Sequence, residues 1–242
     1  MVNQMTLTHH IQKYIVETLM YQKAARFRDL RPPKTDTNLF SYHLKALIKS
    51  GLVEKSEQGY SLSTAGLSYV DRVSTESHTV RSQPKIVTML LVQNSDGQVL
   101  LQKRSKQPYI DTWTLPYGKL HIEDATLEKA AMREALEKLN LKNAPVCHVG
   151  DCYIRVMVEG DILSTTLAHI FRFETDEVKE NERLKWVEPL DLATLPLAPA
   201  VEQIVARAFF HDQFFFEEYE QQWLSEVFAN PAVDRASAHS EH

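Results

Sequence analysis

Residues 74–84, STESHTVRSQP, separate two patterned segments of the chain, because Val80 is their one large apolar residue. Such a composition is typical of a linker and not of a buried element. The length of 242 residues also suits two domains better than one small core. We therefore expect five segments: an N-terminal domain over 1–73, a linker over 74–84, a second domain over 85–208, a C-terminal helix over 209–230 and a disordered tail over 231–242.

The two main segments differ in charge. Residues 1–83 carry 11 Lys and Arg against 7 Asp and Glu, whereas the rest of the chain carries 16 against 25. This asymmetry indicates domains with different partners. The overall 43% hydrophobic and 24% charged residues are ordinary for a globular protein, which excludes a largely disordered, collagen-like or coiled-coil chain.

Three features favour a cytoplasmic location. The longest largely apolar run, residues 86–92, is far shorter than the roughly 20 residues of a membrane-spanning helix. The first residues do not show the charged and then apolar pattern of a secretory signal. Two cysteines, Cys147 and Cys152, are too few for a disulfide framework, so we expect both to be reduced.

Two helices are predicted at the start of the first domain. Thr8 is a suitable N-cap for the first helix, whose apolar residues recur at helical spacing. Residues 24–30 predict a short second helix with Phe27 and Leu30 turned inward, which the prolines that follow would end. The apolar residues of the first helix are Ile11, Ile15 and Leu19.

A third helix, a hairpin and a last helix complete this domain. The third helix is expected from about residue 36 to residue 50, where Gly51 can end it in a left-handed conformation. Apolar and polar residues then alternate around a turn at Gly59, which predicts a β-hairpin. Thr64 is the expected cap of the last helix. The residues that the third helix should bury are Phe40, Leu44, Leu47 and Ile48.

The segment FSYHLKALIKSGLVEKSEQGYSLSTAGLSYV resembles the winged helix-turn-helix of bacterial transcription regulators. The resemblance implies that the third helix enters the major groove of duplex DNA and that the wing contacts the backbone. A structural or protein-contact role is the alternative, because this fold does not fix one function. The residues that would contact DNA are Lys34, Thr35, Asn38, Ser41, Tyr42, Lys45 and Lys49.

The second domain alternates strands and helices. An Asp-Gly turn joins apolar strands predicted at residues 85–93 and 98–104. Residues 126–139 predict a helix with an apolar stripe, and Pro199 can open a later helix. Further strands are expected at 146–158, 162–173 and 185–187, and the stripe of the first helix comprises Leu127, Ala130, Ala131, Leu136 and Leu139.

This order, with the lead-in WTLPYG before the first helix, is similar to the Nudix family, which hydrolyses nucleoside diphosphates linked to another group. The Nudix resemblance implies an α/β/α sandwich for this domain. With the winged helix-turn-helix before it and a C-terminal aromatic helix expected from residue spacing, the predicted fold class is α+β. The family's box reads G-x5-E-x7-R-E-U-x-E-E-x-G-U, with U aliphatic. Arg133, Glu134, Glu137 and Leu141 match it, and the departures are Lys119 and Asn140 at the glycines and Ala125 and Lys138 at two glutamates.

The departures bear on metal binding. Carboxylates at i, i+3 and i+4 share one helix face and can bind Mg²⁺ or Mn²⁺ together, but Lys138 replaces one of them with an ammonium group. The resemblance therefore implies Glu134 and Glu137 as catalytic residues and metal ligands, with Glu182 or Glu180 as a further carboxylate. Ordinary helix salt bridges are the alternative interpretation. The residues that would contact a ligand are Arg104, Lys119, Arg133 and Lys138.

The C-terminal segment 209–228 is rich in aromatic residues. Phe215, Tyr219 and Trp223 recur every four residues, which predicts an apolar helix face packed on its own chain or on a second subunit. A homodimer is therefore expected. His121, in the loop before the box helix, is expected to face solvent.

Three functions fit these observations. The first is a regulator that binds DNA through the winged helix and a nucleoside-diphosphate-linked metabolite through the Nudix domain, with weak or no hydrolysis. The second is an active Mg²⁺-dependent hydrolase with an accessory winged helix. The third is a scaffold for protein contacts. The altered box favours the first.

Overall fold

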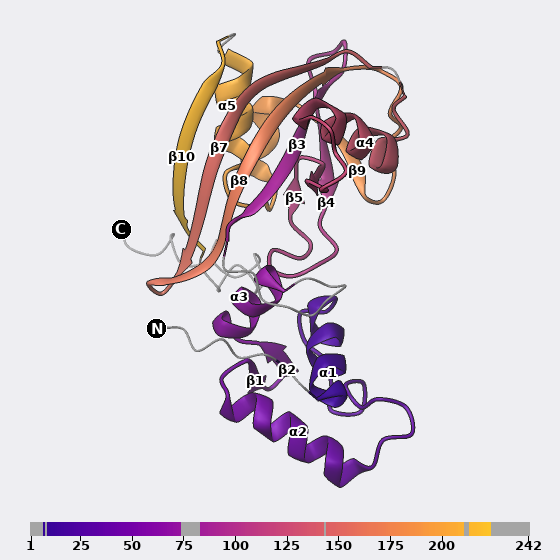
Figure 1. The fold of residues 1–242 in the computed structure, drawn as a ribbon, viewed down its shortest axis with the longest axis vertical. Helices are drawn as coiled ribbons and strands as arrows, with labels where there is room; N and C mark the ends of the chain where they lie inside the picture. Colours follow the sequence, from indigo (N-terminus) through magenta and orange to yellow (C-terminus); the bar gives the residue numbers. More distant parts are fainter. Residues whose placement is uncertain (1–6, 8, 74–82, 143, 211–212, 224–242) are drawn as a thin grey trace, which may run out of the picture.

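The computed structural model describes residues 7, 9–73, 83–142, 144–210 and 213–223, which form two modules (Figure 1). One hydrophobic core lies within residues 7–73, and the other two flank a sheet built from later residues. Leu67 is partly buried and packs against both the first core and the sheet. The modules are therefore joined by side-chain packing as well as by the chain.

The N-terminal module contains three helices and one hairpin. The elements in chain order are α1 (His10–Met20), α2 (Thr37–Lys49), β1 (Val53–Ser56), β2 (Gly59–Leu62) and α3 (Thr64–Arg72). Asp36 caps α2, because its carboxylate accepts from the main-chain N–H groups of Asn38 and Leu39. His9 is the N-cap of α1, and the expected cap Thr8 lies outside the described residues. The cap of α3 is Ser63 rather than Thr64.

The short helix expected at residues 24–30 is wrong. These residues form a bridge and turns, because Ala25 exchanges two main-chain hydrogen bonds of 2.9 Å with Tyr60 of β2. This pairing holds Ala25 in an extended conformation that a helix does not allow. Leu30 is buried as expected, whereas Phe27 is partly exposed. In α2, Ile48 is also exposed, while the other three predicted residues are buried.

The second module is a mixed sheet in the order β10-β7-β8-β3-β4-β5, with β6 paired to β3 and β9 paired to β4. Long strands β7 and β8 form an antiparallel hairpin, and β3 runs parallel to β8. The strands are β3 (Lys85–Gln93), β4 (Val99–Lys103), β5 (Trp113–Thr114), β6 (Tyr117–Lys119), β7 (Val146–Val158), β8 (Asp161–Glu174), β9 (Leu184–Val187) and β10 (Phe215–Gln222). The helices are α4 (Leu127–Leu139), the 3-10 turn η1 (Pro189–Thr194) and α5 (Val201–Phe210).

Helices cover both faces of this sheet. Ala131 and Ala135 of α4 pack with Leu90 of β3 on one face. Ile204 of α5 packs with Leu91 of β3 on the other face. This arrangement confirms the expected α+β chain with an α/β/α sandwich. No helix in the described ranges is long and apolar enough to cross a membrane.

The C-terminal helix predicted at 209–230 is wrong over residues 213–223, whereas residues 209–210 end α5. Residues 215–222 form β10, which pairs in parallel with β7 (Figure 1). A four-residue spacing keeps side chains on one face of a strand as well as of a helix, so the aromatic stripe did not distinguish a helix from a strand. Phe215 and Trp223 pack against the core of their own chain, the first of the two expected arrangements, and the homodimer stays a prediction. The tail 231–242 lies outside the described residues.

Helix α3 contacts β8 of the second module. The Ser68 hydroxyl donates to the Ile162 carbonyl at 3.0 Å. The Asp71 carboxylate, almost fully buried, pairs with the Lys85 ammonium group at the start of β3. A buried carboxylate without this cation would be costly, so the pair fixes α3 against the sheet.

Candidate functional site

Helix α4 carries the residues expected to form the site. Thr126 begins it by accepting a hydrogen bond from the Lys129 N–H at 3.1 Å. Asn140 ends it with a φ of 56°, the left-handed conformation that favours glycine or asparagine. Asn140 therefore takes the backbone role of the box glycine that it replaces. Leu136, expected in the buried stripe, is exposed instead.

Glu134 points from α4 into the sheet and is almost fully buried. Its carboxylate lies above Gly118 of β6, in space that a β-carbon at that position would occupy. Position 118 therefore requires glycine because the Glu134 carboxylate approaches its backbone closely, and not because of a special backbone angle. The sequence contains this signal, because Gly118 directly precedes the position of the first box glycine.

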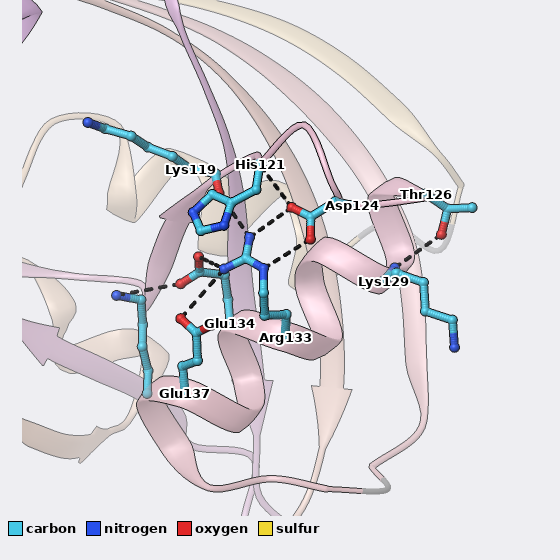
Figure 2. A network of polar contacts seen from close by, with 9 residues as sticks. Lys119, His121, Asp124, Thr126, Lys129, Arg133, Glu134 and Glu137 are labelled. Atoms are coloured by element: carbon cyan, nitrogen blue, oxygen red, sulfur yellow. Dashed lines mark hydrogen bonds and ion pairs between the residues drawn. The ribbon is translucent and has the colours of Figure 1, made fainter. Parts of the chain in front are cut away.

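Arg133 of α4 is the centre of a polar network that joins the helix to Lys119 and Asp124 (Figure 2). Its Nη1 lies 2.6 Å from Glu134 Oε1 and 3.5 Å from Glu137 Oε2. Its Nε and Nη2 donate to the two carboxylate oxygens of Asp124 at 2.9 and 2.8 Å. One guanidinium group therefore contacts three carboxylates.

Asp124 is a site residue that the sequence analysis missed. The hydrogen bonds from Arg133 lower the pKa of Asp124 to about 2, although burial opposes the shift. The main-chain N–H of His121 donates a further bond of 2.8 Å to the Asp124 carboxylate. An available signal was the position of Asp124, one residue before Ala125, where the family's first glutamate is missing.

The carboxylates of α4 face cations of their own chain. Lys138 Nζ lies 3.6 Å from Glu134 Oε2, so Glu134 has Arg133 on one oxygen and Lys138 on the other. Glu137 keeps a side chain that is 55% exposed. A cluster of Mg²⁺ ions requires several free carboxylate oxygens, and this arrangement does not fit it.

The predicted ligand contacts Lys119 and Arg104 lie apart from each other. The main-chain oxygen of Lys119 accepts from Arg133 Nη2 at 3.1 Å, and its side chain extends away from the network (Figure 2). Arg104 donates to the Tyr117 hydroxyl and to the Pro108 carbonyl. Tyr117 is paired with Met89, which belongs to the core on the α5 face of the sheet. Arg104 is therefore on the face opposite Glu134.

Two tyrosines surround Arg104. Its guanidinium carbon lies 5.3 Å from the ring centroids of both Tyr109 and Tyr117. Burial alone would raise the pKa of Tyr117, but the positive charges of Arg104 and Lys85 outweigh it and lower that pKa. Lys85 is also the partner of Asp71. The Arg104 cluster is thus continuous with the contact between the modules.

The remaining expected carboxylates lie before β9. Glu180 accepts a hydrogen bond of 2.7 Å from the main-chain N–H of Trp186, so its carboxylate stabilises the loop that leads into β9. Glu182 is exposed in the adjoining turn. The structure thus shows a local structural role for Glu180, and Glu182 as a metal ligand remains a prediction.

The residues expected to contact DNA line one side of α2 and its approach. Asn38, Tyr42, Lys45 and Lys49 are exposed, with Tyr42 at 68%. Lys34 is exposed in a left-handed turn before the helix. Thr35 and Ser41 are half-buried. Figure 1 shows α2 at the end of the molecule away from the sheet.

Solved structures with related folds have limited similarity to this chain. The mutator MutT protein from Bacillus halodurans is 23% identical, with a TM-score of 0.46, over 56% of this chain and 89% of its own. The NUDIX domain of NrtR from Shewanella oneidensis, crystallised with ADP ribose, is 18% identical with a TM-score of 0.42, and the match covers 57% of this chain and 92% of that domain. NrtR from the same organism, complexed with a 27mer DNA, is 20% identical with a TM-score of 0.42, and the match covers 52% of this chain and 59% of NrtR.

The sequence itself matches a known domain family. The match is to the NUDIX domain and spans residues 83–208, more than half of the chain. It includes the hairpin of β3 and β4, helix α4 with Arg133 and Glu134, and helix α5 up to residue 208. The chain belongs to the NUDIX domain family.

Proposed function

We propose that this protein is a ligand-responsive, DNA-binding transcriptional regulator whose Nudix domain binds a nucleoside-diphosphate-linked metabolite with weak or no hydrolysis. The observation that carries the proposal is the position of α3. Its Leu67 packs in both modules, and its Asp71 forms a buried ion pair with Lys85 of the sheet. A ligand that shifts the sheet would therefore shift the N-terminal module as well.

The surface of α2 supports DNA binding. Lys45 and Lys49 supply positive charge for phosphates, and Asn38 carries an amide suited to base edges. These side chains are exposed on the helix that lies away from the sheet (Figure 1). A duplex can therefore approach α2 without displacing the Nudix module.

The network on α4 supports binding over turnover. Pyrophosphate hydrolysis in this family depends on divalent cations that neutralise phosphate charge and activate water. Here Arg133 and Lys138 occupy the oxygens of Glu134. The guanidinium group of Arg133 and the ammonium group of Lys138 can bind a phosphate directly when the phosphate replaces the Glu134 carboxylate as their partner.

An active hydrolase with an accessory N-terminal module is the second candidate. Glu137 favours it, because its side chain is 55% exposed, so a divalent cation can reach its carboxylate from solvent. In this alternative Glu134 and Glu137 bind a single Mg²⁺ or Mn²⁺ with the phosphates of the substrate. Wild-type turnover that Glu134→Gln abolishes would establish this function and reject the proposed regulator.

A two-part experiment tests the regulator. Genomic fragments bound by the full chain are first selected, and their affinity is then measured with and without ADP-ribose, a nucleotide sugar and a nucleoside triphosphate. We expect one of these compounds to change DNA affinity. Leu67→Ala should reduce that change because it loosens α3 in both cores, whereas Leu190→Ala, at an exposed position, should not. Selection of no DNA would contradict the proposal.

A further inference from the structure

We propose that His148, Asp151 and His169 form a binding site for a divalent transition-metal ion of the Zn²⁺ class, separate from the carboxylates of α4. His148 Nε2 lies 2.8 Å from Asp151 Oδ1, and His169 Nδ1 lies 2.7 Å from the same oxygen. Each residue offers one ligand atom, and these atoms all lie within 4.8 Å of one another. Two imidazole nitrogens and one carboxylate oxygen therefore converge on one point.

A β-bulge produces this convergence. His148 and Asp151 are three residues apart, so in a regular strand their side chains would point to opposite faces. The pairing of β7 with β8 shifts between His148 and Gly150, which leaves Val149 as an extra residue. The bulge turns His148 to the face of Asp151, and bulges commonly redirect a side chain in this way.

The neighbouring elements hold the three residues in place. Asp151 of β7 is directly opposite His169 of β8 in the antiparallel ladder. The ring of His148 stacks on Phe171 with centroids 4.5 Å apart and lies edge-on to Phe214 at 5.1 Å. The His148 ring is thus placed by packing, and His169 by the strand register and its hydrogen bond with Asp151, before any ion binds. This lowers the cost of binding.

The ligand set indicates the class of metal. Imidazole nitrogen binds Zn²⁺, Ni²⁺ and Cu²⁺ well, whereas Mg²⁺ prefers oxygen ligands throughout. Three protein ligands also leave a fourth tetrahedral position for water. The side chains are 29%, 22% and 13% exposed for His148, Asp151 and His169, so an ion can enter from solvent.

The site lies on the α4 face of the sheet. His169 is opposite Thr88 of β3, and Thr88 is opposite Gly118 of β6, above which the Glu134 carboxylate lies. Two strand spacings, about 10 Å, therefore separate the backbone of His169 from that of Gly118. An ion here would add positive charge to the same face as Arg133 without sharing a ligand with α4.

Titration of the full chain with Zn²⁺ alone tests the proposal, with Co²⁺ as a probe whose visible absorption reports its coordination. We expect one tight equivalent at pH 7.5 and weaker binding in acid, because metal binding to imidazole and carboxylate ligands competes with protons. Asp151→Asn and His169→Gln should each weaken binding by at least about 100-fold, since loss of even an outer partner costs about 10–100-fold.

Matched controls separate this site from other groups. His121→Gln alters the histidine beside α4, and Asp161→Asn alters an exposed carboxylate on β8; neither should change the tight equivalent. Thermal melting identifies any variant that fails to fold. In that case His148→Gln, which alters the most exposed of the three ligands, replaces that variant in the Zn²⁺ titration. Equal Zn²⁺ affinity and Co²⁺ spectra for the wild type and the folded ligand variants would overturn the proposal.

Discussion

The carboxylate of Glu134 occupies the space directly above Gly118. A β-carbon placed on Gly118 would lie 1.7 Å from Glu134 Cδ and 1.9 Å from each carboxylate oxygen. Glu134 is held there by Arg133 at 2.6 Å and by Lys138 at 3.6 Å. The position of this side chain thus depends on a missing side chain in β6 as much as on its charged partners.

Gly118→Ala should displace Glu134 without unfolding the protein. The clash falls on the far end of a side chain that can rotate, so we expect a small change in melting temperature. The ion pairs of Glu134 with Arg133 and Lys138 should break, and affinity for a diphosphate-linked nucleotide should fall. Isothermal titration measures this affinity. The control is Gly97→Ala in the turn before β4, where the positive φ of 82° strains an alanine away from α4, so it shows whether strain at a glycine alone lowers the affinity. Unchanged nucleotide affinity would contradict a role for this contact.

Lys138→Glu should strengthen Mg²⁺ binding. The change removes the ammonium group beside Glu134 Oε2 and places a third carboxylate one turn from Glu134. Hard cations gain affinity with each carboxylate, so Mg²⁺ titration should show tighter binding than the wild type. Phosphate release from a nucleotide panel shows whether turnover rises with it. Lys129→Glu is the charge-matched control on the same helix, and an equal gain there would mean that only net charge matters.

Strong local patterns predicted most of the fold from the sequence. Helices α2 and α4 and the strands β3, β7 and β8 follow their apolar periodicity, and the Asp96-Gly97 turn joins β3 and β4 as expected. The predictions for two segments were wrong, because backbone pairing with distant residues determines the conformation of each. Ala25 is held by Tyr60, and the aromatic segment of β10 is held by β7.

The candidate site was predictable only where it follows the box on one helix. Arg133, Glu134 and Lys138 follow from spacing along α4. Helical spacing could not place Asp124 and Gly118, because a loop and a sheet contact bring them to the helix, and their positions beside altered box residues were the signals available. The cluster of His148, Asp151 and His169 depends on a bulge and a strand register, neither of which periodicity reveals.

Asp124→Asn should alter stability in acid. The folded-state pKa of Asp124 is about 2, below the value of about 3.9 for an unfolded chain. The stabilisation is therefore complete above about pH 4 and is lost as the pH falls toward 2. The wild type should lose melting temperature more steeply than Asp124→Asn across this range. Asp96→Asn, in an exposed turn, should keep the wild-type slope, and identical slopes for all three proteins would disprove the prediction.

Phe215→Ala should destabilise the second module. Phe215 is 2% exposed, and its ring lies against Gly150 of β7, where a β-carbon would meet it at 2.6 Å. Truncating a buried phenylalanine costs about 3–5 kcal/mol of unfolding free energy. Phe216→Ala is the control, because this side chain is 58% exposed and its loss should cost less than about 0.5 kcal/mol. Urea unfolding compares the two, and equal effects would show that β10 is not part of the core.

The double variant Lys45→Ala and Lys49→Ala should reduce the salt dependence of DNA binding. Each lysine that neutralises a phosphate contributes about 0.9 to the slope of log affinity against log salt, so the slope should flatten by roughly one to two units. Both lysines are exposed on α2.

A control must separate phosphate contacts from net charge. Lys129→Ala with Lys142→Ala removes the same charge from exposed positions on the Nudix module. Binding is measured by fluorescence anisotropy on one selected fragment between 50 and about 200 mM salt, the range in which phosphate contacts dominate the loss of affinity. A flatter slope for the α2 variant alone would place duplex DNA on this helix. Equal slopes for both double variants would instead show that α2 does not face the phosphates, and the N-terminal module would then be a protein-contact domain.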